Sequence, residues 1–446
     1  MFVNRLLTSL VFKNIHSSVM CASKTCPTSL EQLSECYNVF KTVISTPQLQ
    51  FLHSLFKNAN YELRIAGGAV RDILNGKLPQ DVDFATTATP KQMIELLNKH
   101  EERVRLIISE SGIAHGTIIA RIDNTQQYEV TTLRIDKKTD GRRAEVEFIK
   151  DWELDALRRD LTINSMFLDM NGNLYDYFNG VNHLKSGIIR FVGNASDRIK
   201  EDYLRILRYF RFFARYGSEN HDDETLTAIR DGIRGLEFIS GERLWIETKK
   251  ILQHKRSIDV IPIMVDVGTL RYMGFDKDKS YDLTEFFKVH SNLYLKSSEF
   301  EPVTLFSSLL GNEDEAMNVI KRLRFSKVEK FCSLFILRHR KQSVNLRSIK
   351  TEIAISGKSE FKNLKKYALE LFKYIGDYDS VEDLSNWQLP AFPVRGTSVL
   401  ERISKKKLVT KVILELKTLW AKSDFSMTED ELLAEIETIV KSIPQE

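Results

Sequence analysis

Two carboxylates spaced one residue apart, Asp81 and Asp83, follow a glycine-rich turn in the first quarter of the chain. The apolar run 63–66 leads into Gly67 and Gly68, which carry no Cβ and let a backbone approach a ligand closely. Because residues i and i+2 of a strand point to the same face, both carboxylates would share one small volume. Two anions that close repel each other unless a divalent cation lies between them. The spacing therefore predicts a metal site.

Glu129 is the candidate for a third carboxylate, because a two-metal phosphoryl-transfer site needs a further anion beside the first pair. A lone glutamate among β-forming residues is more often a solvated surface residue, so it is the combination with Asp81 and Asp83 that favours a site for Mg²⁺. In such a site one ion binds a triphosphate and the other lowers the pKa of an attacking hydroxyl. Gly68 would then supply a backbone donor to the phosphates, and Arg71 a cation.

A second cluster, residues 155–164, places Arg158 and Arg159 between acidic residues just before an apolar run. A capped turn with surface ion pairs, which contribute little energy, would explain it. The functional alternative puts Arg159 at the phosphate or ribose of a nucleotide, with Asp160 and Asn164 orienting its guanidinium.

The third cluster, residues 201–211, has helical periodicity and brings Asp202 and Arg205 together at i, i+3. A modest helix ion pair is the simple interpretation. The alternative is a pair that recognises a base, since cytosine and adenine both present an exocyclic amine donor beside a ring-nitrogen acceptor. Guanine and uracil present a ring N–H and a carbonyl there, so the same pair would reject them. Arg208 and Arg211 follow Arg205 at the same three-residue spacing and could reach a triphosphate.

The composition is ordinary for a globular protein, with 42% hydrophobic and 28% charged residues. The length of 446 residues suggests about three domains. No stretch approaches the roughly 20 apolar residues that a membrane helix needs. The net charge of +4 argues neither for nor against nucleic acid, but residues 321–373 hold fifteen Lys or Arg against four acids. A solvated helical surface and a surface that contacts RNA both remain open for this region.

The N-terminal segment resembles a mitochondrial transit peptide, because its first thirty residues contain Arg5, Lys13 and Lys24 but no acid. A disordered tail is the alternative. Met20 could serve as an internal start and give a second form without this segment. The cysteines form neither a disulfide framework nor a zinc spacing, which suits a reducing compartment: Cys21, Cys26, Cys36 and Cys332.

Hydrophobic periodicity divides the chain into an α/β part and a helical remainder. Helices are predicted at 31–60 and, after a Thr-Pro start signal, at 90–100. Strand patterns dominate from 61 to 176, at 63–66, 82–85, 104–108, 117–122, 128–133, 145–148 and 165–169. After Gly193 the periodicity is helical to the end of the chain.

Together these motifs resemble those of the class II CCA-adding enzymes, the tRNA nucleotidyltransferases of bacteria and eukaryotes within the DNA polymerase β-like superfamily. The resemblance implies catalytic and metal-binding roles for Asp81, Asp83 and Glu129. It implies nucleotide-binding roles for Gly68, Arg71, Arg159, Asp202, Arg205, Arg208 and Arg211. Residues 134–151 resemble the flexible loop linked with the switch from C to A addition, 187–193 the hinge between head and neck, and 241–247 the neck motif that supports the base-recognising helix.

The implied fold class is α+β, a mixed-sheet nucleotidyltransferase head followed by an all-helical neck, body and tail. The expected boundaries are 1–30 for the transit peptide, 31–187 for the head, 188–260 for the neck, 261–389 for the body and 390–446 for the tail.

The implied function is template-independent addition of C, C and A to the 3′ end of tRNA from CTP and ATP, with Mg²⁺ as cofactor. The tRNA would be bound through its 3′ end and its acceptor and T arms, without a membrane. The expected location is the mitochondrion, with cytoplasm and nucleus reached by a form starting at Met20. A poly(A) polymerase of the same superfamily and a catalytically inert RNA-binding protein are the alternatives. Monomer and homodimer are both compatible with the sequence.

Overall fold

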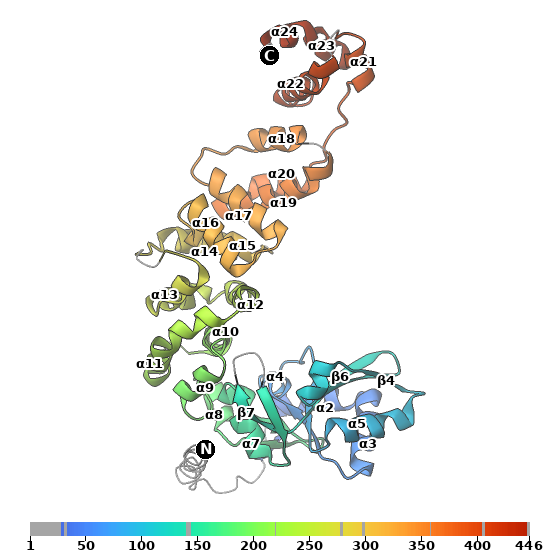
Figure 1. Ribbon diagram of the computed structural model, residues 1–446, viewed down its shortest axis with the longest axis vertical. Coiled ribbons are helices and arrows are strands. Elements are labelled where there is room, and N and C mark those ends of the chain that lie inside the picture. The colour runs from blue at the N-terminus through green and yellow to red at the C-terminus, as the bar shows by residue number, and fades with distance from the viewer. Residues whose placement is uncertain are drawn as a thin grey trace, which may run out of the picture. The chain divides into compact units, whose positions relative to one another are not determined.

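The computed structural model describes residues 28–30, 34–139, 144–218, 220–276, 280–296, 299–356, 358–403 and 406–443. These residues form two compact units, one within residues 1–239 and one within residues 240–446 (Figure 1). The predicted transit peptide lies outside the described residues up to position 27.

The first unit is built on a mixed sheet of eight strands with the order β1-β10-β9-β2-β3-β6-β5-β4. Among the described strands of this sheet, all neighbours are antiparallel except β3 and β6, which are parallel. A separate hairpin joins β7 to β8. The strands are β1 (Thr28–Ser29), β2 (Leu63–Ala66), β3 (Asp83–Thr86), β4 (Val104–Ile107), β5 (Thr117–Ile122), β6 (Gln126–Thr132), β7 (Arg134–Thr139), β8 (Ala144–Phe148), β9 (Phe167–Leu168) and β10 (Asn173–Tyr175).

The sheet follows from the apolar patterns of its strands. All four residues of β2 are buried, whereas β5 alternates buried and half-buried residues, as a strand with one covered face does. The strands predicted at 63–66 and 117–122 match β2 and β5. The short strands β1 and β10 and the strand β7 escaped prediction. The mixed-sheet head is confirmed.

Helices and short 3₁₀ turns complete the first unit (Figure 1). They are α2 (Ser34–Ile44), α3 (Pro47–Asn58), α4 (Gly68–Leu74), α5 (Pro90–Leu97), η2 (Asn98–His100), α6 (Glu110–Ala114), α7 (Trp152–Leu157), η3 (Thr162–Asn164), α8 (Gly180–Ser186), α9 (Ala195–Glu201), α10 (Arg205–Tyr216), α11 (Asp223–Gly232) and η4 (Ile233–Phe238).

Two predictions about the N-terminal part need correction. The single helix expected at 31–60 is two helices, because Pro47 begins α3 and leaves Thr46 extended, at φ −62° and ψ 121°. The sheet also begins before the expected border of the head. Thr28 and Ser29 pair with β10, and Leu30 is fully buried and donates its N–H to the Gly172 carbonyl at 2.9 Å.

Every element of the second unit within the described residues is helical, which confirms the helical remainder. Its elements are α12 (Gly241–Leu252), α13 (Ser257–Asp266), η5 (Thr269–Met273), α14 (Thr284–Leu295), α15 (Pro302–Phe306), η6 (Ser307–Leu309), α16 (Glu313–Leu323), α17 (Lys327–His339), α18 (Leu346–Ile355), α19 (Lys358–Ile375), α20 (Tyr378–Asn386), α21 (Gly396–Leu400), η7 (Lys406–Leu408), α22 (Val409–Lys422), α23 (Glu429–Ala434) and α24 (Ile436–Ser442). The last helices have a hydrophobic cluster of their own, in which Leu416 and Leu432 are fully buried.

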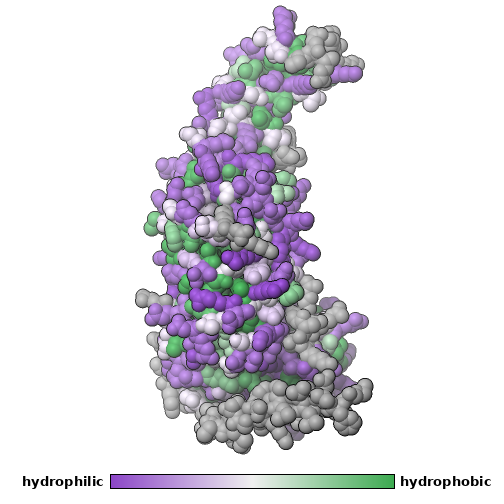
Figure 2. Space-filling view, turned by 60° about the vertical axis from the view of Figure 1, so that its left-hand side comes forward, coloured by the Kyte–Doolittle hydropathy of each residue, from purple (hydrophilic) through white to green (hydrophobic). Residues whose placement is uncertain are grey.

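The described surface is mostly hydrophilic on the face drawn in Figure 2, with hydrophobic residues gathered in patches between hydrophilic ones. None of the described helices is long and apolar enough to cross a membrane.

Candidate active site

The parallel pairing of β3 with β6 sets Asp83 directly beside Glu129. Residues paired in a parallel ladder point to the same face of the sheet, and Asp81 lies two residues before Asp83 on the chain. Both Asp83 and Glu129 are exposed, while Phe84 and Val130, the next residues on each strand, are buried. The structure thus brings together the carboxylates that the sequence singled out.

The electrostatics of these carboxylates fit a divalent cation. Asp83 and Glu129 are exposed overall, but the surrounding protein shields their carboxyl groups from part of the solvent. This partial desolvation raises the pKa of Asp83, and the charge of Asp81 raises it further. It likewise raises the pKa of Glu129, with an added contribution from Asp83. Loss of solvent and repulsion by neighbouring carboxylates therefore oppose the ionisation of Asp83 and Glu129 until a cation offsets them. Among the described side chains no group of three ligands is closed around an ion position, but Mg²⁺ characteristically takes one or two carboxylates and completes its shell with water and phosphate oxygens.

The glycine turn ends β2 and starts α4. Gly67 has a φ of +66°, a conformation that L side chains rarely adopt, and a Cβ there would lie 3.0 Å from Nη1 of Arg159. Gly68 is the first residue of α4, whose first N–H groups lack partners within the helix. Arg71, one turn later, is only 5% exposed and lies against Gly68. The turn therefore brings the two predicted phosphate contacts to one place.

Arg159 is oriented by Asp155, which corrects the roles expected for Asp160 and Asn164. The guanidinium of Arg159 donates to Oδ2 of Asp155 from Nε at 3.2 Å and from Nη2 at 3.0 Å. Asp160 instead accepts from Nε of Arg208 at 2.7 Å, and Asn164 contacts Arg159 only through its backbone carbonyl, at 3.5 Å. The reason is helical spacing, because Asp155 lies on α7 four residues before Arg159.

Asp155 is the buried anion of this part of the site, with a side chain only 1% exposed. It also accepts from Nε of Arg158 at 2.8 Å and from the backbone N–H of Arg134 at 3.1 Å. Burial alone would raise the pKa of Asp155, but Arg159 and Arg158 hold it below its ordinary value. Burial, reinforced by Arg158, lowers the pKa of Arg134 to about 10. Asp136 also pairs with Arg134, at 4.0 Å, so three arginines face two carboxylates here, and the excess positive charge suits an anionic ligand.

The predicted helix 201–211 is interrupted at Asp202, which corrects the i, i+3 geometry. Helix α9 ends at Glu201, Asp202 is extended with φ −152° and ψ 106°, and α10 starts at Arg205. The cause is local, because Oδ1 of Asp202 accepts the Leu204 N–H at 3.0 Å and so competes with a continuous helix. Asp202 and Arg205 remain neighbours, since the Arg205 N–H donates to the Asp202 carbonyl at 2.9 Å.

Glu201 is a site residue that the sequence interpretation missed. It forms an ion pair with Arg205 at 2.7 Å, and Arg205 also donates to the carbonyl oxygens of Arg198 and Arg158 at 3.1 and 3.2 Å. These contacts fix the Arg205 guanidinium and connect it to the cluster around Asp155. The i, i+4 spacing of Glu201 and Arg205 was a signal that could have found it.

Arg205, Arg208 and Arg211 are spaced by three residues along α10, so they follow one side of the helix. Arg208 is bound to Asp160, and the Arg211 guanidinium lies 4.4 Å from the ring centre of Phe212. Both arginines are half-buried. Within the segment expected as a loop at 134–151, β7 and β8 pair as antiparallel strands, and residues 140–143 lie outside the described residues.

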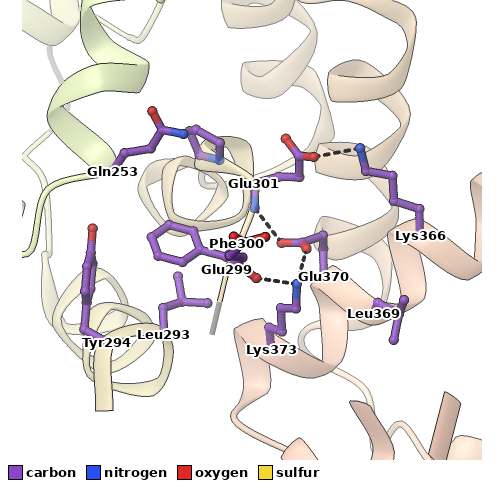
Figure 3. A pocket seen from close by; sticks show the side chains of 11 residues that line it. Gln253, Leu293, Tyr294, Glu299, Phe300, Glu301, Lys366, Leu369, Glu370 and Lys373 are labelled. Carbon is purple, nitrogen blue, oxygen red and sulfur yellow. Dashed lines mark hydrogen bonds and ion pairs between the residues drawn. The ribbon is translucent and has the colours of Figure 1, made fainter. Parts of the chain in front are cut away.

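A cavity of about 740 Å³ in the second unit, lined by residues of α14, α15 and α19, does not fit a nucleotide (Figure 3). Its charges compensate one another, because Glu370 accepts from Lys373 at 2.7 Å and Lys366 pairs with Glu301 at 2.7 Å. With Glu299, three glutamates face two lysines, so no positive excess is left for a triphosphate.

Several cations of the basic region 321–373 are engaged within the second unit. Arg338 pairs with Glu313 at 3.1 Å, Lys350 pairs with Asp383 at 2.8 Å, and Arg340 donates to carbonyl oxygens. Exposed lysines of the same region include Lys327, Lys341 and Lys362. The RNA-contact interpretation therefore remains a prediction for those exposed side chains.

Comparisons with known proteins agree with this geometry. Residues 63–190 match a family described as "Poly A polymerase head domain", and residues 221–274 one described as "Probable RNA and SrmB- binding site of polymerase A". The fold and the site thus define a nucleotidyltransferase.

Two relatives cover most of the chain. The proteins named "CCA tRNA nucleotidyltransferase 1, mitochondrial" of Mus musculus and Homo sapiens are each 45% identical over 398 residues, which is 88% of this chain and 90% of the relative. The chain belongs to the CCA tRNA nucleotidyltransferase family, as its motifs predicted. The crystal structure of Bacillus stearothermophilus CCA-adding enzyme in complex with CTP has the same fold, with a TM-score of 0.69 and 22% identity over 89% of this chain and 98% of that one.

Replacing Asp83 should separate catalysis from stability. We expect Asp83→Asn to reduce nucleotide incorporation by about 10³-fold, the factor that several kcal/mol of metal-ion stabilisation represents. In metal-free buffer its melting temperature should equal or exceed that of the wild type, because the raised pKa shows that the ionised carboxylate is disfavoured in the fold. Glu95→Gln, an exposed change on α5, is the control. Unchanged incorporation would remove Asp83 from the metal site.

Replacing Asp155 should destabilise the protein in a pH-dependent way. At pH 7 we expect Asp155→Asn to lower the free energy of unfolding by about 3–5 kcal/mol, because buried arginines lose their counter-charge. The folded pKa of Asp155 lies below its ordinary value of 3.8, so its stabilisation is complete above that value and is lost as the pH falls through the folded pKa. Urea unfolding at pH 7 and below pH 4 measures this. A difference that does not shrink in acid, or one matched by Asp197→Asn on the surface, would contradict it.

Proposed function

We propose that this protein completes the 3′ ends of tRNA by adding C, C and A from CTP and ATP, through two-metal-ion nucleotidyl transfer. The observation that carries the proposal is the pairing of Asp83 with Glu129 in the same unit as the Asp202–Arg205 segment. The pair of Asp83 and Glu129 suits metal-assisted nucleotidyl transfer, and the pair of Asp202 and Arg205 suits the choice of base. The names of the mouse and human relatives, which are similar over nearly their whole length, support the same activity.

In the proposed reaction the 3′-oxygen of the RNA forms a bond to the α-phosphorus of the nucleotide, and the bond to pyrophosphate breaks. Asp81, Asp83 and Glu129 would hold Mg²⁺, which when bound neutralises phosphate charge and lowers the pKa of the attacking hydroxyl. Arg71, Arg208 and Arg211 supply cations for the triphosphate, and the N–H of Gly68 supplies a donor. Arg159, which is held by Asp155, is the candidate for a contact to the ribose or to a phosphate of the nucleotide.

Base choice is assigned to Asp202 and Arg205. The carboxylate accepts from the exocyclic amine of cytosine or adenine, and the guanidinium donates to the adjacent ring nitrogen. Guanine and uracil would instead set their carbonyl against the carboxylate and their ring N–H against the guanidinium, which leaves polar groups unpaired. Glu201 holds the guanidinium in place through the 2.7 Å ion pair.

The location in the cell is also a proposal. The relatives named mitochondrial match this chain, and its acid-free N-terminal segment suits import into that organelle. A form starting at Met20 would lack most of this segment and remain outside the mitochondrion. Fluorescent fusions of the full chain and of a chain starting at Met20 test both statements.

The activity is tested by supplying single nucleotides to a labelled tRNA that lacks its 3′-terminal CCA. With CTP alone we expect two additions, with CTP and ATP together three, and with ATP alone no long tail. Long tails from ATP without any use of CTP would support a poly(A) polymerase instead. Binding of the tRNA without incorporation of either nucleotide would support an inert RNA-binding protein.

Base choice should depend on the charge of Asp202. Asp202→Asn keeps an oxygen that can accept the Leu204 N–H but replaces half of the base-facing acceptor with a donor. We expect the preference for CTP over UTP, measured as the ratio of kcat/KM, to fall by about 10- to 100-fold, the factor for a hydrogen bond to a charged group. Metal dependence should stay unchanged. Asp197→Asn on α9 is the matched control, and an unaltered preference in Asp202→Asn would refute the assignment.

A further inference from the structure

Arg71 is enclosed by protein groups from three parts of the first unit. Its Nε and Nη2 donate to Oδ1 of Asp72 at 3.0 and 2.9 Å, and its Nη1 donates to Oδ1 of Asn164 at 2.6 Å. The rings of Phe212 and Tyr216, both on α10, lie 5.1 and 4.7 Å from its guanidinium carbon. Three of the five N–H groups of an arginine are thus engaged, and the direction of the guanidinium is fixed by its neighbours.

The groups around Arg71 form a chain of contacts that starts and ends on α10. At one end, the Tyr216 hydroxyl donates to Oδ1 of Asp72 at 2.9 Å, the same oxygen that holds Arg71. At the other end, Arg208 binds Asp160 at 2.6 Å, and the Asn164 amide donates to Asp160 at 3.3 Å while its oxygen accepts from Arg71. Arg208 and Tyr216 are eight residues apart on the helix, a separation of about 12 Å.

We propose that Tyr216 and Asp72 are positioning residues, which tie the helix carrying the base-recognising Arg205 to the phosphate-binding Arg71. This inference rests on the proposed function of those two arginines. Neither Tyr216 nor Asp72 touches the nucleotide in the proposal. They set the distance and the rotation between the group that recognises the base and the group that binds the triphosphate.

Tyr216 provides the attachment at the C-terminal end of α10. The N-terminal end is attached to the head by Arg205, which donates to the Arg158 carbonyl at 3.2 Å, and by Arg208, which binds Asp160. The contact between Tyr216 and Asp72 is the polar link that sets the C-terminal end of the helix against Arg71. Burial favours this link, because the side chains of Arg71 and Asp72 are only 6% and 16% exposed, so their contact is little screened by solvent. Burial also raises the pKa of Tyr216, so its hydroxyl stays a donor at neutral pH.

The test is Tyr216→Phe, which keeps the ring against Arg71 and removes only the hydroxyl. The same unit offers a matched control, because the Tyr175 hydroxyl donates to Asp169 at 3.2 Å and the Tyr175 ring lies 3.6 Å from the guanidinium carbon of Arg64. Tyr175→Phe therefore removes a similar hydrogen bond elsewhere in the head. For both variants we would measure KM for CTP, ATP and tRNA, kcat, the melting temperature and equilibrium binding of CTP without RNA.

We expect Tyr216→Phe to raise KM for CTP and for ATP by about tenfold, the factor that one hydrogen bond to a charged group represents. KM for tRNA should stay within twofold, and Tyr175→Phe should change none of these values by more than twofold. A nucleotide KM unchanged in Tyr216→Phe, an equal rise in Tyr175→Phe, or a parallel rise of KM for tRNA would overturn the proposal.

Two further variants show whether the effect passes through Arg71. Asp72→Asn weakens the same link from its other side and should raise the nucleotide KM even if Tyr216→Phe folds poorly. In an Arg71→Lys background, removing the Tyr216 hydroxyl should have no additional effect on CTP binding, whereas a purely structural role would leave the effect intact. If the wild type added neither C nor A, the proposed function itself would fail, while the shift in CTP binding would still test the link.

Discussion

The parallel pairing of β3 with β6 is the constraint on which the site depends. It sets Asp83 beside Glu129 on strands about 4.8 Å apart, a spacing at which two carboxylates repel. The buried side chains of Phe84 and Val130 hold this register, since a slip of one residue would turn the carboxylates toward the core and the apolar groups toward water. The hydrophobic core thus keeps like charges together, and desolvation together with their mutual repulsion raises the pKa of both carboxyls.

The arginines near this carboxylate pair show the opposite imbalance, an excess of positive charge. Asp155 holds Arg158 and Arg159, and the Nε and Nη1 atoms of the nearby Arg134 are buried without a hydrogen-bond partner among the described residues. The raised pKa values of Asp83 and Glu129 therefore favour a cation beside them, and the excess of arginine over carboxylate around Asp155 favours an anion. A metal ion with a nucleoside triphosphate supplies both charges at once, so the bound state should be more stable than the free one. Unbalanced charges and shifted pKa values of this kind are common at sites that bind highly charged ligands.

Local signals in the sequence were sufficient for most strands of the head, for the helical character of the second unit and for most of the candidate site residues. Alternating apolar residues are visible within a few positions, so the strands at 63–66 and 117–122 were predicted as they stand. Contacts between distant segments were not predictable, because no local pattern encodes the 2.6 Å bond from Arg71 to Asn164. The error at Asp202 has a different cause, since the hydrogen bond of a short polar side chain to the backbone overrode helical periodicity there. Burial is the remaining property that the sequence did not reveal. The helical spacing of Asp155 to Arg159 was visible, but the burial of Asp155 was not.

The break before α10 leaves Asp202 outside a helix, whereas the contacts of Arg208 and Tyr216 attach α10 to the head. These two features act differently on the two ends of a bound nucleotide. Cytosine and adenine differ in size, so a single site that accepts both must keep the triphosphate fixed while part of the base-recognising pair adjusts. Arg205 is held by Glu201, which leaves Asp202 as the group that can adjust. From Arg208 to Tyr216 the helix is bound to the head through Asp160 and Asp72, which fixes the part nearest Arg71, the proposed phosphate contact. Asp202, by contrast, lies outside any helix, between the end of α9 and the start of α10, and its backbone is not held by a helical ladder. A continuous helix through residues 201–211, as its periodicity suggested, would have made both ends equally rigid and removed that freedom.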